Sequence, residues 1–67
     1  MPETKSRIGR VFFDIASARI EDLKTNLASG AVADMQEYRL ICGRIDGILN
    51  SMDMFADAEK RLEEEGR

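Results

Sequence analysis

The stretch from Tyr38 to Leu62 constrains the fold most strongly, because apolar residues recur along it at alternating intervals of three and four positions. The row consists of Tyr38, Ile41, Ile45, Ile48, Met52, Phe55, Glu59 and Leu62, of which seven of the eight are apolar. This spacing places the side chains on one face of an α-helix, as in the seam of a coiled coil. Asp34 with Glu37 three positions later fits a capping box. The sequence therefore predicts a helix over residues 34–64.

A second apolar row predicts an earlier helix over residues 6–29. Its members recur at helical spacing and are Ile8, Phe12, Ile15, Ala16, Ile20, Leu23 and Leu27. Thr4 or Ser6 can cap the first turn by accepting hydrogen bonds from free backbone N–H groups. Gly30 can adopt the left-handed conformation that ends a helix.

The short connection over residues 30–33 predicts that the two helices fold back on each other. At 1.5 Å per residue they would be roughly 35 and 45 Å long. Such a pair joined by so short a loop favours an antiparallel hairpin, so we expect one all-α domain over residues 1–67 that assembles further into a helical bundle. The expected helix-packing core consists of Phe12, Ile15, Ile20, Leu23, Tyr38, Ile41, Ile45, Ile48, Met52 and Phe55.

The composition argues against catalysis and against several classes of ligand. The 67 residues include no histidine and one cysteine, which removes histidine acid–base chemistry, His/Cys zinc sites and disulfides within the chain. Carboxylates one turn apart, such as Asp53 and Asp57, are typical of a solvated helix face. Cys42 has no histidine to act as its base, which favours a small buried apolar role. We therefore expect no enzymatic activity, no cofactor and no bound metal.

The charge and hydropathy patterns indicate proteins as the partners. A net charge of −3 disfavours nucleic acid, and no apolar run approaches the roughly 20 residues of a membrane span. No secretory signal is visible, and the unpaired Cys42 suits a reducing compartment. Lys5, Arg7 and Arg10 give a basic start, while Glu63–Glu65 give an acidic end. Opposite ends of this kind suit antiparallel association or binding of the basic end to an acidic partner, although solvated helix termini would show the same pattern.

Two glycines inside the second predicted helix point to a candidate interface. Each costs about 1 kcal/mol relative to alanine, and Gly43, Gly47 and Ser51 form a row of small residues beside the heptad seam. Such a row lets another helix approach closely, either within the hairpin or between protomers, although a kink or simple tolerance is an alternative. Val11 and Phe13 widen the apolar surface of the first helix. The expected protein interface consists of Val11, Phe13, Leu40, Gly43, Gly47, Ser51 and Met54.

The run from Tyr38 to Gly47 resembles a stretch found in short proteins of tailed bacteriophages. The shared pattern is Tyr-Arg-x-x-Cys-Gly-x-Ile-x-Gly, and the similarity extends from the Ser29-Gly30 turn through the acidic C-terminal helix. Such proteins are commonly encoded near head and portal components. The resemblance implies a structural or assembly protein of the virion, located in the host cytoplasm or the particle. A small helical inhibitor or adaptor that binds a host or phage enzyme is the alternative.

Overall fold

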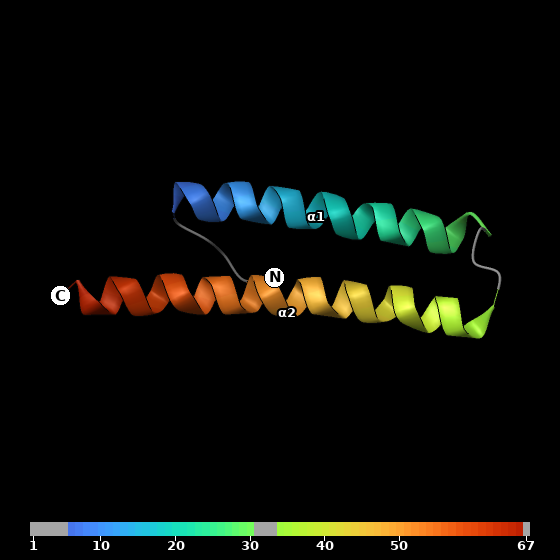
Figure 1. The fold of residues 1–67 in the computed structure, drawn as a ribbon. Coiled ribbons are helices and arrows are strands. Elements are labelled where there is room, and N and C mark those ends of the chain that lie inside the picture. Colours follow the sequence, from blue (N-terminus) through green and yellow to red (C-terminus); the bar gives the residue numbers. More distant parts are fainter. Residues whose placement is uncertain (1–5, 31–33, 67) are drawn as a thin grey trace.

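The protein folds as two antiparallel α-helices packed side by side (Figure 1). The computed structural model describes residues 6–30 and 34–66. Helix α1 spans Arg7–Ala28 and helix α2 spans Met35–Glu65, in a molecule that measures 52 × 18 × 14 Å. The prediction of an all-α helical hairpin is confirmed, and each predicted helix end lies one residue from the observed one. Thr4 and residues 31–33 of the predicted turn lie outside the described residues.

Local side-chain chemistry sets the helix ends. Ser6 is the N-cap of α1, and its Oγ accepts a hydrogen bond from the Gly9 N–H at 3.0 Å. Asp34 is the N-cap of α2, and its carboxylate accepts from the Glu37 N–H at 2.8 Å. Each contact satisfies a backbone donor that the helix itself leaves without an acceptor. After α1, Gly30 has a φ of +77°, the left-handed conformation that glycine adopts without steric cost.

A small apolar cluster holds the helices together. Met52 is only 1% exposed and packs with the buried Ala16 and Ile20. Phe12 stacks on Phe55 with ring centroids 4.7 Å apart. Further side chains of this cluster are Phe13, Ile45 and Ile48, each half-buried. The small Ala16 gives the long Met52 side chain room opposite it, which is how large and small residues interdigitate in a helix contact.

The predicted core falls into three groups by burial. Ile20, Ile41 and Met52 are buried, whereas Phe12, Leu23, Ile45, Ile48 and Phe55 are half-buried. Two assignments are wrong for the hairpin: Ile15 is 59% exposed and Tyr38 is 47% exposed. Ile15 lies about 100° around α1 from the buried Ala16, outside the sector that a single partner helix can cover. Tyr38 lies near the start of α2, where α1 has already ended at Ala28.

The open end of the hairpin is closed by Ser6 and Glu59. The Ser6 backbone N–H donates to the Glu59 carboxylate at 3.1 Å, and the Ser6 hydroxyl donates to the same oxygen. Hydrogen bonds to a carboxylate are stronger than those between neutral groups. This contact explains why Glu59 occupies an otherwise apolar row. Beyond it the last turns of α2 extend past the start of α1, which leaves Leu62 exposed (Figure 1).

We predict that Met52→Ala lowers the free energy of unfolding by about 2–5 kcal/mol, because it removes a fully buried side chain and leaves a cavity between the helices. Met35→Ala is the matched control, since Met35 is 62% exposed, and should change stability by about 0.5 kcal/mol or less. Urea denaturation followed by circular dichroism measures both. Equal losses for the two variants would show that Met52 is not at the centre of the helix contact.

Candidate protein interface

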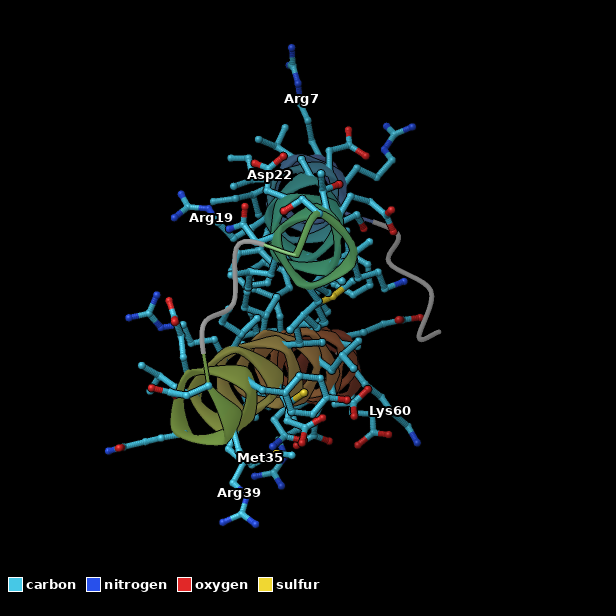
Figure 2. The ribbon with its side chains drawn as sticks, turned by 90° about the vertical axis from the view of Figure 1, so that its right-hand side faces the viewer. Arg7, Arg19, Asp22, Met35, Arg39 and Lys60 are labelled. Atoms are coloured by element: carbon cyan, nitrogen blue, oxygen red, sulfur yellow. The ribbon has the colours of Figure 1, made fainter. Side chains whose placement is uncertain are left out.

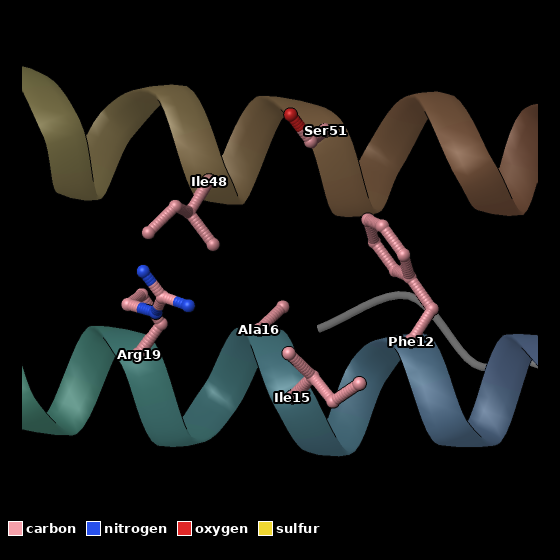
Figure 3. Close-up of a pocket in the computed structure, with 6 residues that line it drawn as sticks. All are labelled: Phe12, Ile15, Ala16, Arg19, Ile48 and Ser51. Carbon is pink, nitrogen blue, oxygen red and sulfur yellow. The ribbon is translucent and has the colours of Figure 1, made fainter.

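A shallow groove runs along one side of the helix contact. Its middle is lined by Phe12, Ile15, Ala16 and Arg19 from α1 and by Ile48 and Ser51 from α2 (Figure 3). Toward the turn it continues over Leu23, Arg44 and Gly47. The two depressions share Arg19, Ile48 and Ser51, so they form one continuous surface. The groove is apolar because its floor is the edge of the hairpin core.

A further depression extends this surface to the open end of the hairpin. It is lined by Ser6, Ile8, Phe55, Ala58, Glu59, Leu62 and Glu63. Ile8, Phe12, Ile15 and Arg19 are spaced by four, three and four residues, which places them on one side of α1. Ser51, Ala58 and Leu62 are likewise on one side of α2. We call this surface the groove face, defined by Ile8, Ile15 and Arg19 of α1 and by Arg44, Ser51 and Leu62 of α2.

Large apolar side chains remain in solvent on the groove face and beside it. On the groove face, Ile8 and Leu62 are 70% and 69% exposed, and Ile15 is also exposed. Leu40, Met54 and Val11, which were predicted to lie at an interface, are exposed as well. Exposed apolar side chains gathered on one face of a small protein make that face a candidate site of association.

The predicted interface residues do not form one surface. Gly47 and Ser51 line the groove, whereas Phe13 packs edge-on against Phe55, with ring centroids 6.5 Å apart, and belongs to the helix contact. Gly43 is exposed and is absent from the groove lining described above. At 100° per residue it lies on the side of α2 opposite Met52, away from α1.

The two glycines are not sites of close helix packing within the hairpin. A methyl group built on Gly43 or Gly47 meets nothing within 4 Å. Of the two alternatives, a tight contact inside the hairpin is therefore wrong, because α1 packs on the Met52 side of α2. Close approach by another chain, a kink or simple tolerance remains to account for the pair.

The charges along the groove are unevenly distributed. Arg19 and Arg44 line it near the turn, whereas Glu59 and Glu63 line it near the open end. Neither arginine has an ion-pair partner among the described residues; the ion pairs found there are Lys24–Glu21 and Arg61–Asp57, both within a helix and exposed. Viewed along the helices, Arg19 and Lys60 emerge on opposite sides of the contact, while Arg7 and Arg39 point directly away from it (Figure 2). The groove face therefore has a basic and an acidic end.

Sequence reasoning missed Arg44 as part of this surface. The signal was present, because Leu40, Arg44, Gly47, Ser51, Met54 and Ala58 repeat at intervals of four, three, four, three and four. This is a second heptad row beside the seam. Its small and charged members hide it from a search for apolar residues alone.

Other kinds of site find little support in the described part of the chain. Over residues 6–30 and 34–66, no three acidic or cysteine side chains are grouped so that they could hold a metal ion. Cys42 is half-buried. In the same residues, neither helix combines the length and apolar character needed to cross a membrane.

The chain matches no protein-family model, no curated protein and no solved structure at a significant level. The resemblance of residues 38–47 to phage proteins therefore stays a hypothesis. The exposed surface of the hairpin is the observation from which a function can be inferred.

We predict that alanine at the two glycines has the same effect on helix stability and different effects on association. Either change should favour the helix by about 1 kcal/mol, because alanine is the better helix former and both positions have open space within the hairpin. Only Gly47→Ala should also weaken association, since Gly47 lines the groove, and a methyl group forced into a packed contact costs about 1–3 kcal/mol. Gly43→Ala is the matched control. Thermal unfolding and sedimentation equilibrium measure the two effects, and indistinguishable association of the two variants would remove Gly47 from the interface.

Proposed function

We propose that this protein is a non-enzymatic structural or assembly protein that acts by packing its exposed helix faces against other helices. The partners are other copies of the chain or a larger protein of a bacteriophage particle. The observation that carries this proposal is the amount of apolar surface that the hairpin leaves uncovered. No active-site geometry competes with it among the described residues.

The buried interior is small for the number of apolar residues in the sequence. Among the described residues only Gly9, Ala16, Ile20, Ile41 and Met52 are buried, although 43% of the sequence is hydrophobic. A chain this small seldom obtains enough stability from its own core and usually gains the remainder by association. Two helical hairpins that pack together on their open apolar faces form a four-helix bundle, which is the simplest way to cover those faces.

The phage setting is supported by the motif alone. The stretch from Tyr38 to Gly47 lies on α2, where Ile41 and Ile45 face α1 while Arg44 and Gly47 line the groove. The motif thus combines residues of the helix contact with residues of the candidate interface. This is the pattern expected if related proteins share both the hairpin and its mode of association.

The proposal predicts that the protein is a component of assembled particles. Virions purified from cells infected with the phage that encodes this chain should contain it at a reproducible copy number when measured by quantitative mass spectrometry. Capsid and portal proteins provide the reference, and an abundant non-structural phage protein provides the control for contamination. Absence from both virions and assembly intermediates, together with stoichiometric recovery on a soluble enzyme, would favour the inhibitor or adaptor alternative.

A further inference from the structure

We propose that the groove face is covered by a second copy of this chain, turned end for end, so that two hairpins form an antiparallel four-helix bundle. This inference rests on the proposed function, because it names the partner of the same surface. The two copies are related by a twofold axis that crosses the helices at right angles. Helix α1 then packs on α1 of the second copy, and α2 packs on α2, each pair antiparallel.

The accessible surface of the single chain exceeds that of an ordinary monomer by about the area that one such contact would bury. The single chain has an accessible surface of 5420 Å². A folded monomer of 7.6 kDa is expected to expose about 4,300 Å². The excess is about 1,100 Å², and a stable protein–protein contact buries about 800 Å² on each partner. A second copy seated on the groove face would bring the exposed area of each chain close to that of an ordinary globular protein.

The charge distribution selects a second copy in this orientation. Arg44 lines the groove near the turn, and Glu63 lines it near the open end. Turning one copy end for end places the basic end of each groove on the acidic end of the other, twice in the same dimer. A parallel arrangement would instead place like charges together, which is destabilising.

The positions of individual side chains along the groove also fit a twofold axis at its middle. Ile15 and Ser51 both line the middle of the groove, so an axis that runs across the groove over both residues places each beside its own copy (Figure 3). Ser51 is small, and its hydroxyl already donates to the Gly47 carbonyl at 2.9 Å, so its burial leaves no donor unsatisfied. Leu40 and Leu62 both lie eleven residues from Ser51, on opposite sides of it. In the dimer they meet, which would cover two exposed leucines at each end.

The first experiment is a charge reversal measured by sedimentation equilibrium of the full chain at micromolar concentration. Arg44→Glu and Glu63→Arg should each raise the dimer dissociation constant by about threefold, because in this register the two long side chains lie about 7.5 Å apart along the helices and each change places like charges near each other twice. The double variant should recover most of the wild-type affinity. Within one chain the two residues are about 28 Å apart along α2, so they cannot compensate for each other without a second copy. Arg10→Glu, on the exposed side of α1 away from the groove face, is the matched control and should dimerise normally.

The second experiment traps the twofold contact by oxidation. In a Cys42→Ser background, Ser51→Cys should form a disulfide-linked dimer rapidly under mild oxidation, because the two copies of residue 51 face each other. Asp46→Cys in the same background, on the exposed side of α2, should remain monomeric on a non-reducing gel. Both variants should keep wild-type helicity by circular dichroism.

Several results would overturn the inference. These are a wild-type chain that sediments as a stable monomer, a double charge reversal no tighter than either single one, or equal crosslinking at positions 46 and 51. A chain that fails these tests but occurs at fixed copy number in particles would keep the proposed function and lose the dimer. A chain that passes these tests but is absent from particles would keep the dimer and lose the proposed function.

Discussion

Everything in this structure depends on the limited contact that two helices can make. One partner covers only a narrow sector of an α-helix, here the sector of α1 around Ala16 and that of α2 around Met52. Apolar side chains outside those sectors stay in solvent regardless of their hydrophobicity. Ile15 illustrates this, because it is adjacent to a buried residue in the sequence yet is mostly exposed. The hairpin is therefore well defined as a fold, yet it leaves several large apolar side chains exposed.

The two rows along α2 have different surroundings in the hairpin. The seam that contains Ile41, Ile45 and Met52 packs on α1, while the neighbouring row that contains Arg44, Gly47 and Ser51 lines the groove. In the proposed dimer, small side chains in the second row allow close approach of another helix, and charged ones favour one orientation of it. Glu59, the single charged member of the seam, binds the Ser6 cap and so aligns the ends of the two helices. The register of the hairpin in turn determines which residues share the groove face.

The fold was predictable from the sequence because its strongest signals are local. The heptad spacing, the Asp34 cap and the Gly30 stop act within a turn or two of the chain, and they predicted both helices and the hairpin. The candidate interface was harder to predict because it depends on how each helix is rotated about its own axis. Ile15 was misplaced in the core for that reason, whereas Tyr38 was misplaced because α1 ends before it can cover the start of α2. The glycine pair was interpreted as a close helix contact either within the hairpin or between protomers, and the choice depends on which side of α2 faces α1.

The central claim is that association completes the stability of this hairpin, and the dependence of thermal unfolding on chain concentration tests it most directly. When folding and association are coupled, mass action raises the unfolding midpoint as concentration increases. We expect the midpoint, followed by circular dichroism at 222 nm, to rise steadily over about a hundredfold range of chain concentration. A sharp transition with the same midpoint at every concentration would show that the isolated hairpin is stable by itself and would contradict this account.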